Sequence, residues 1–247
     1  MPARSDEESK KYIVDAHCHI LPGIDDGASD MDTTLDMLKT ASTEGITHIV
    51  ATPHFKINHH NKSIEKIEEV LADVKKSAAD NNIDIDITLG SEVRFFNDIE
   101  EAYEQKRLCT MNSTDYLMVE FYPDDEFKMI RDALETVRSL GLNPVLAHVE
   151  RYNALRSIQN VKQLYESGVI ISVNATSITG GQGLMTKLYL KKLLKNRYIS
   201  LVATDAHDRD RRAPKMAACR EYLYSHYDED YVDEILYKNA LTYFNLQ

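Results

Sequence analysis

The chain carries histidines and carboxylates at short intervals, and most of them end a short apolar run. The first such run ends in Asp-Ala-His-Cys-His, in which His17 and His19 are two residues apart. On a strand this spacing points both imidazoles to the same face, which suits two nitrogen ligands of one metal ion. The other candidate ligands follow later apolar runs and are His54, Glu92, Glu120, His148, Asp205 and His207.

A metal centre explains this set better than isolated polar residues do. One histidine at a strand end is usually only a polar residue beside a loop, but five histidines and three carboxylates at corresponding places are hard to explain in that way. Imidazoles mixed with carboxylates suit Mn, Fe or Zn better than Ca or Mg. The cysteines, Cys18, Cys109 and Cys219, are too widely separated in the sequence to suggest a thiolate zinc site.

These side chains need elements that bring strand ends together, and the hydrophobic pattern predicts such elements. Strand-like runs alternate with helical periodicity in about seven units. The predicted strands are 12–17, 47–52, 83–90, 116–120, 144–148, 169–174 and 200–204. The predicted helices are 31–44, 63–79, 99–106, 129–140, 161–166, 188–195, 215–224 and 231–243.

Such alternation favours an α/β fold with a parallel sheet. About seven units without a strong edge strand favour a closed, distorted parallel (β/α)7 barrel of the TIM-like type, with an open doubly wound sheet as the alternative. In a barrel, the carboxyl ends of all strands meet at one mouth, so the candidate ligands would meet there too. We expect one domain over residues 12–247 and a disordered polar tail over 1–11.

Composition narrows the classes of function and location. The formal net charge is -11 and no basic stripe offsets it, which argues against a nucleic-acid partner. No apolar run approaches the roughly 18 to 20 residues that cross a bilayer, so we expect no membrane insertion. Residues 1–11 contain no apolar signal-peptide core, and the cysteines are few and odd in number. These features predict a cytoplasmic protein.

Four motifs resemble the PHP (polymerase and histidinol phosphatase) superfamily. They are Asp-Ala-His-Cys-His-Ile-Leu-Pro-Gly-Ile-Asp-Asp-Gly-Ala over 15–28, Ala-Thr-Pro-His over 51–54, Ala-His-Val-Glu-Arg-Tyr over 147–152, and Ala-Thr-Asp-Ala-His over 203–207. The link from the second histidine to Asp-Asp-Gly is similar to the bacterial manganese-dependent protein-tyrosine phosphatases that regulate capsule and exopolysaccharide synthesis. The resemblance extends from about Tyr12 to the C-terminus.

The resemblance implies a site for three metal ions, most naturally Mn²⁺, with Fe and Zn as alternatives. Asp26 is chosen over Asp25 because it directly precedes Gly27. The implied ligands of the first metal are His17, His19, Glu92 and Asp205. Those of the second metal are Glu92, Glu120 and His148, and those of the third are Asp26, His54 and His207.

The same resemblance implies that Arg151 and Arg212 face the phosphate, although Arg209 and Arg211 lie close enough in sequence to compete with Arg212. Asp205 completes the expected catalytic set. A metal cluster lowers the pKa of a bound water, so hydrolysis would need no covalent enzyme intermediate. The implied substrate is a phosphotyrosine protein, namely the tyrosine-rich tail of a bacterial tyrosine kinase.

Rival phosphatase chemistries fit the sequence poorly. The cysteine-based route requires Cys-x5-Arg, but the residues six positions after the three cysteines are Ile24, Asp115 and Ser225. The segment 84–88 fits Asp-x-Asp-x-Thr only superficially, because it begins a predicted strand instead of ending one.

Three other functions remain as alternatives. A histidinol-phosphate phosphatase would use the same metal site. An amidohydrolase would typically place a lysine at the end of the fourth strand, where this chain has Glu120. A non-catalytic scaffold would tend to lose ligands, whereas all nine positions here hold competent side chains. The remaining histidines are expected to be structural (His48), in a loop (His59 and His60) or on the surface (His226).

Overall fold

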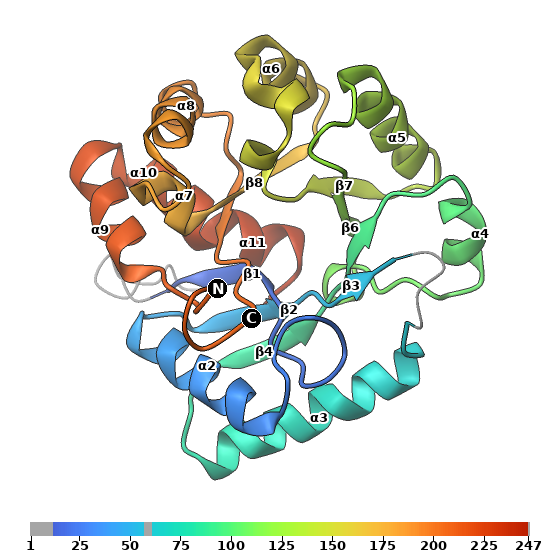
Figure 1. Cartoon of the computed structure of the whole chain (residues 1–247), viewed down its shortest axis with the longest axis vertical. Coiled ribbons are helices and arrows are strands. Elements are labelled where there is room, and N and C mark those ends of the chain that lie inside the picture. The colour runs from blue at the N-terminus through green and yellow to red at the C-terminus, as the bar shows by residue number, and fades with distance from the viewer. Residues whose placement is uncertain (1–11, 57–60, 247) are drawn as a thin grey trace, which may run out of the picture.

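The computed structural model describes residues 12–56 and 61–246. Its parallel strands form the centre of the molecule and its helices surround them (Figure 1). The strands are β1 (Val14–Cys18), β2 (His48–Ala51), β3 (His54–Phe55), β4 (Asp86–Leu89), β5 (Glu92–Arg94), β6 (Tyr116–Glu120), β7 (Asn143–Leu146), β8 (Ile170–Asn174) and β9 (Leu201–Ala203).

The strands pair in the orders β1-β2-β4 and β3-β5-β6-β7-β8-β9. Backbone bonds after β9 bring the two ends of this arrangement together, because Asp205 N donates to His17 O and His19 N donates to Ala206 O, both at 2.8 Å. Cys18 and Ala206 form a parallel bridge at the same place. The expected barrel-like parallel α/β fold is therefore confirmed.

Two predicted strands are each followed by a short strand that was not predicted. Predicted strand 47–52 contains β2, and after a break at Pro53 the chain continues as β3. Predicted strand 83–90 contains β4, and after a break at Gly90 the chain continues as β5. Gly90 packs closely, since a Cβ there would lie 2.8 Å from the sulfur of Met111. Because β2 pairs with β4 and β3 pairs with β5, both breaks occur together and divide the strands into two sheets.

The helices begin close to their predicted positions. Asp30 caps the first by accepting a hydrogen bond from Thr33 N, and Ser63 caps the next by accepting from Lys66 N. The helices are α2 (Met31–Thr43), α3 (Ile64–Asp80), α4 (Ile99–Glu104), α5 (Phe127–Ser139), α6 (Ile158–Glu166), α7 (Ala175–Thr179), α8 (Leu184–Lys195), α9 (Ala217–His226), α10 (Glu229–Asp233) and α11 (Asn239–Tyr243). A π-helical turn, Glu234–Lys238, divides the predicted helix 231–243.

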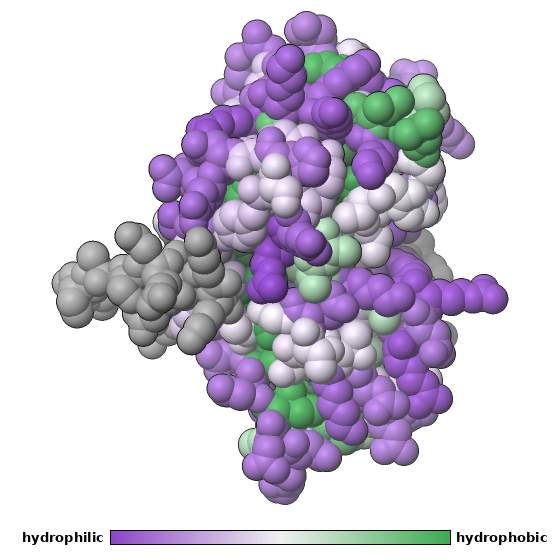
Figure 2. All heavy atoms as spheres, turned by 90° about the vertical axis from the view of Figure 1, so that its left-hand side faces the viewer, coloured by the Kyte–Doolittle hydropathy of each residue, from purple (hydrophilic) through white to green (hydrophobic). Residues whose placement is uncertain are grey.

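Apolar side chains fill the space around the strands, and most strand residues are buried. On the face shown in Figure 2, hydrophilic side chains predominate and only small apolar patches interrupt them. No helix in the described part of the chain is long and apolar enough to span a membrane. The predicted tail 1–11, with His59 and His60, lies outside the described residues.

Candidate metal centre

The predicted ligands come together at the carboxyl ends of the strands. Glu120 ends β6, while His148 and Asp205 each lie two residues beyond a strand. His54 and Glu92 occupy the first positions of β3 and β5, directly after the two strand breaks, and they are register partners. The breaks therefore bring these two side chains into the same site.

Two of these residues have unusual backbone conformations. His148 has a φ of 33° and Asp205 a φ of 53°, although neither is a glycine. The left-handed region costs an ordinary residue about 1–2 kcal/mol. Outliers of this kind gather at functional sites, where the surrounding structure holds them in place.

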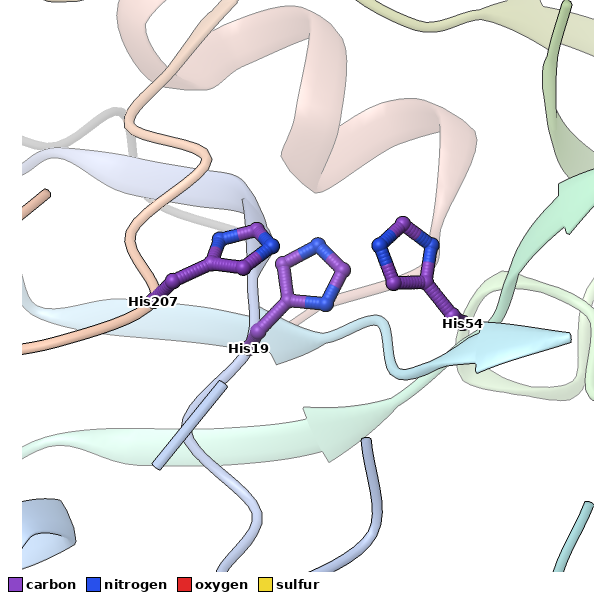
Figure 3. A group of neighbouring side chains, drawn as sticks. All are labelled: His19, His54 and His207. Carbon is purple, nitrogen blue, oxygen red and sulfur yellow. The ribbon is translucent and has the colours of Figure 1, made fainter. Parts of the chain in front are cut away.

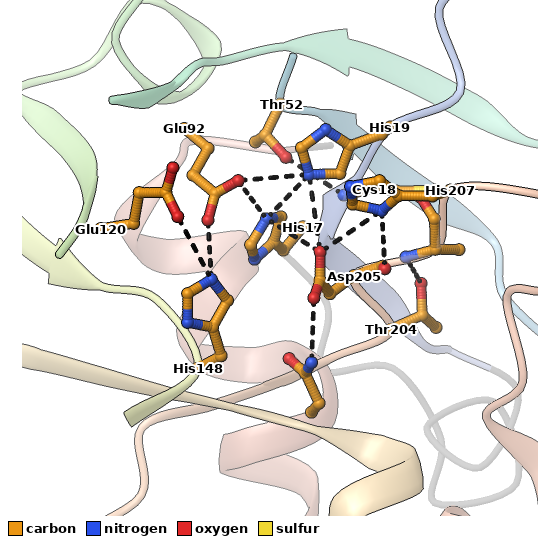
Figure 4. Close-up of polar contacts among 12 residues, drawn as sticks. His17, Cys18, His19, Thr52, Glu92, Glu120, His148, Thr204, Asp205 and His207 are labelled. Carbon is orange, nitrogen blue, oxygen red and sulfur yellow. Dashed lines mark hydrogen bonds and ion pairs between the residues drawn. The ribbon is translucent and has the colours of Figure 1, made fainter. Parts of the chain in front are cut away.

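The donor atoms converge most closely around His17 and His19 (Figure 4). Their Nε2 atoms are 3.1 Å apart. Glu92 Oε2 lies 3.3 Å from each of them, and Asp205 Oδ1 lies 3.5 Å from each. Four potential ligands thus face one small volume.

The hydrogen bonding of these carboxylates fits a metal site. Glu92 Oε2 and Asp205 Oδ1 are buried and have no hydrogen-bond partner of acceptable geometry. A buried carboxylate oxygen without compensation is costly, so such groups normally pair with a donor or a metal ion. The donor set and its geometry therefore match a divalent cation.

Glu92 also faces a second group of ligands. Its Oε1 lies 2.7 Å from His148 Nε2, whereas its Oε2 faces the first group. Glu120 Oε2 lies 4.0 Å from the same His148 nitrogen, and Arg94 donates to Glu120 Oε1 at 2.9 Å. The two oxygens of Glu92 thus point to different groups, which is the geometry of a bridging carboxylate.

A third group contains three adjacent imidazoles, from His19, His54 and His207 (Figure 3). Their ring centroids are 4.6 Å apart for His19 and His54 and 3.8 Å apart for His19 and His207. Asp26 Oδ1 lies 3.3 Å from His54 Nε2 and 4.0 Å from His207 Nε2. Solvent reaches this group from the Asp26 side, because the Asp26 side chain is 66% exposed while those of His54 and His207 are 12% and 5% exposed.

The adjacent carboxylate, Asp25, has a different role. It is buried, and its Oδ2 lies 2.7 Å from His19 Nδ1 and accepts a hydrogen bond from His54 N at 2.9 Å. Gly27 N donates to its other oxygen. Asp25 therefore orients His19, while Asp26 faces the third group of ligands.

The pKa values of the imidazoles reflect the density of charge. Burial alone would lower the pKa of His19, but the adjacent carboxylates of Asp25 and Glu92 outweigh burial and raise the value to about 10. Burial lowers the pKa of His148 to about 4, and burial with the charge of His19 lowers that of His207 to about 3. Protons and metal ions compete for such nitrogens, so cations would replace the proton on His19.

Two of the candidate arginines lie at the centre. Arg151 contacts Asp205 Oδ2, and Arg212 Nη2 lies 3.0 Å from the same oxygen. Their side chains are 35% and 41% exposed, so part of each side chain is accessible from solvent. Arg209 pairs instead with Asp36 of α2 at 3.0 Å, and Arg211 is exposed. Of the three arginines over 209–212, the structure thus brings Arg212 to the site.

Several supporting residues were not predicted from the sequence. Asn174 donates to Asp205 Oδ2 at 3.0 Å, and Tyr152 Oη lies 3.2 Å from His148 Nδ1. Asp15 accepts hydrogen bonds from the backbone and hydroxyl of Thr204, at 2.8 Å and 2.5 Å, and so ties β1 to the end of β9. Asp15, Tyr152 and Thr204 belong to the motifs quoted in the sequence analysis, so their place in those motifs could have indicated a role at the site.

The remaining singled-out residues lie apart from the centre. His48 begins β2 at the opposite end of the strands, 3.4 Å from Asp86 at the start of β4. His226 ends α9 and is exposed. Segment 84–88 thus begins a strand at the end away from the ligands, as predicted.

The sequence is similar to those of known proteins. The family model described as "Capsular polysaccharide synthesis, CpsB/CapC" matches residues 13–245. Tyrosine-protein phosphatase YwqE of Bacillus subtilis is 30% identical over 199 residues, covering 79% of this chain and 78% of that protein. Tyrosine-protein phosphatase CpsB of Streptococcus pneumoniae is 27% identical over 233 residues, and the match covers 92% of this chain and 96% of that protein.

The fold agrees with these matches. A solved structure, described as one of YwqE from Bacillus subtilis and CpsB from Streptococcus pneumoniae, "unique metal-dependent tyrosine phosphatases", has a TM-score of 0.87 to this chain. It is 27% identical in sequence, and the similarity covers 95% of both chains.

Proposed function

This chain belongs to the CpsB/CapC family of capsular polysaccharide synthesis proteins, and we propose that its metal centre hydrolyses phosphotyrosine in proteins. The enzyme is a metal-dependent protein-tyrosine phosphatase. One observation carries the proposal most directly: two buried carboxylate oxygens, on Glu92 and Asp205, lack hydrogen-bond partners and face the Nε2 atoms of His17 and His19. The family relationship then indicates which reaction the metals serve.

We assign nine side chains to three metal ions, with Mn²⁺ as the expected metal and Fe or Zn as alternatives. The supporting geometry is the convergence of donor atoms from eight of these side chains in four overlapping groups, with Asp26 beside His54 and His207. The proposed ligands are His17, His19, Glu92 and Asp205 for one metal; Glu92, Glu120 and His148 for the second; and Asp26, His54 and His207 for the third.

The chemistry is divided between the metals and the arginines. A bound metal cluster supplies an activated water near neutral pH and neutralises charge on the phosphoryl oxygens. Arg151 and Arg212 are held on Asp205 with part of each side chain exposed, so they can donate to those same oxygens. The leaving tyrosinate has a pKa of about 10, so it needs less help from a proton donor than an alkoxide does.

The decisive test is phosphate release from a phosphotyrosine peptide by protein stripped of metal, with and without added Mn²⁺. Histidinol phosphate is assayed in parallel. We expect Mn²⁺-dependent release from the peptide. Release mainly from histidinol phosphate would move the function to the small-molecule alternative. No release from either compound would revive the amidohydrolase or scaffold hypotheses.

The relatives' link to capsular polysaccharide synthesis supports a narrower proposal, that the substrate is the tyrosine-phosphorylated tail of a bacterial tyrosine kinase. We would compare the rate on an autophosphorylated kinase with the rate on unrelated phosphotyrosine proteins. Equal rates would contradict this choice of partner. The cytoplasmic location expected from the sequence stays a prediction.

A further inference from the structure

A pocket of about 420 Å³ adjoins the metal centre on the side of β3. Asp25, Asp26 and His54 line both the centre and the pocket, so a molecule bound at the metals reaches the pocket directly. The far walls come from the start of α3, which runs along the lower edge of Figure 1, and from the segment after α4, the helix on its right. The mechanism proposed above makes no use of this space.

The pocket combines apolar and cationic walls. Pro53, Phe55 and Ile67 supply apolar surface, and the last two are 6% and 8% exposed. The positively charged residues Lys56, Lys62 and Arg107 line the same space. The guanidinium of Arg107 lies 5.7 Å from the centroid of the Phe55 ring, which places its charge above the apolar surface.

The three cations gather at one pocket of a chain whose formal net charge is -11. Within 12–56 and 61–246, none of the three takes part in an ion pair, whereas nearby Lys66 and Lys76 on α3 each have a carboxylate partner within 3.0 Å. The two carboxylates of the lining, Asp25 and Asp26, lie beside the imidazoles of His19 and His54, so the three cations repel one another unless an anion lies between them. Their arrangement therefore complements a negatively charged ligand.

We infer that this pocket binds an acidic side chain of the substrate protein, close in sequence to the phosphotyrosine. This inference rests on the proposed function, which places the phosphoryl group at the metals between Arg151 and Arg212. The pocket lies on the His54 and Asp26 side of the centre, so it can receive a neighbouring residue while the phosphoryl group is held at the metals. The carboxylate would contact the three cations while its methylene groups pack against Phe55.

The experiment uses the Mn²⁺-loaded full chain and phosphotyrosine peptides with amidated ends. The two positions before and the two positions after the phosphotyrosine are varied one at a time, and at each position a peptide with Glu is compared with one that has Gln. We expect one Glu position to raise kcat/KM roughly fivefold over Gln, the effect of about 1 kcal/mol. The preference should decrease as ionic strength increases. A peptide with a second phosphotyrosine at that position shows whether the pocket prefers phosphate to carboxylate, and a larger gain from phosphate would overturn the choice of carboxylate.

The triple variant Lys56→Gln/Lys62→Gln/Arg107→Gln should reduce the Glu-to-Gln ratio to about one. Its matched control is Lys191→Gln/Lys192→Gln/Lys195→Gln, which removes the same charge from exposed positions on α8 and should keep the ratio. Circular dichroism checks that both variants fold. An unchanged ratio in the first variant, or no Glu preference in the wild type, would overturn the inference alone. No hydrolysis of any peptide would overturn the proposed function with it.

Discussion

The two ends of the strands carry similar residues in very different surroundings. At the amino end, His48 lies 3.4 Å from Asp86, whose side chain is 78% exposed. At the carboxyl end, Glu92 is 1% exposed and lies within 3.3 Å of imidazole nitrogens from His17, His19, His54 and His148. A histidine beside a carboxylate is thus common to both ends, but only one end gathers many such groups away from water.

This difference has an electrostatic origin. The charge of Asp86 is solvated, so it needs no metal ion to stabilise it. Burial raises the pKa of Glu120, and the charge of Glu92 raises it further, because two buried carboxylates disfavour each other's ionisation. Cations near both groups relieve that repulsion. Convergence and burial, more than residue type, therefore separate a metal centre from a solvated pair.

The largest effect should follow substitution of a proposed ligand at the carboxyl end. Asp205→Ala removes a metal ligand and the group that holds Arg151, Arg212 and Asn174. We expect kcat to fall at least about a hundredfold, since even supporting residues of metal sites cost 10–100-fold. Phosphate release with Mn²⁺ measures the loss, and circular dichroism checks that the fold is retained. His17→Ala should behave in the same way, and full activity in either variant would refute the ligand assignment.

Removal of the metals should destabilise the protein as well as inactivate it. A ligand bound only by the folded state adds about 2.7 kcal/mol when its concentration is a hundred times its dissociation constant. Dialysis against a chelator should therefore lower the melting temperature, and Mn²⁺ should restore it.

The same melting experiment compares the two ends of the strands directly. Asp205→Ala should largely abolish the Mn²⁺-dependent shift in melting temperature, while Asp86→Ala should keep it. A shift of equal size in both variants would show that Mn²⁺ stabilises the fold from somewhere other than the carboxyl end.

A smaller loss is expected when an arginine is removed and the ligands stay. Arg151→Ala deletes a donor to the phosphoryl oxygens, and charge-assisted hydrogen bonds contribute about 1.5–3 kcal/mol each, which corresponds to a fall in kcat/KM of about 10- to 100-fold. Steady-state kinetics on a phosphotyrosine peptide measures this fall. Arg209→Ala is the matched control, because Arg209 pairs with Asp36 outside the centre. Unchanged kcat and KM in Arg151→Ala would exclude the arginine from catalysis.

The sequence predicted which side chains converge better than it predicted the path of the chain between them. Alternating apolar runs and the His-x-His spacing are features of the local sequence, so the barrel-like fold and the position of His17 and His19 could be predicted from them. The predicted strands end at Thr52 and Gly90, beside the two breaks, but the short strands β3 and β5 that follow were not predicted, because strands of two and three residues are too short to show periodicity. The closure of the strands through Cys18 and Ala206 joins residues far apart in the sequence, and periodicity carries no information about such pairings.

The separate roles of Asp25 and Asp26 were beyond the sequence for a similar reason. Adjacent aspartates have the same chemistry, and only the turn decides that one is buried against His19 while the other faces His54 and His207. A Cβ on Gly27 would lie 2.2 Å from the carbonyl oxygen of His19. The turn therefore requires a glycine at position 27, and this is the residue from which the sequence analysis chose Asp26 over Asp25.

The smallest effect should come from the amino end. Asp86→Asn removes a charge that is mostly solvated, and exposed pairs of this kind contribute about 0–1 kcal/mol. Urea unfolding should show a free energy of unfolding within about 1 kcal/mol of the wild type, and kcat/KM on a phosphotyrosine peptide should not change. A large loss of activity would mean that the two ends are coupled through the strands. Unchanged activity would show that a histidine beside a carboxylate contributes to catalysis only where burial and convergence create a site for metal ions.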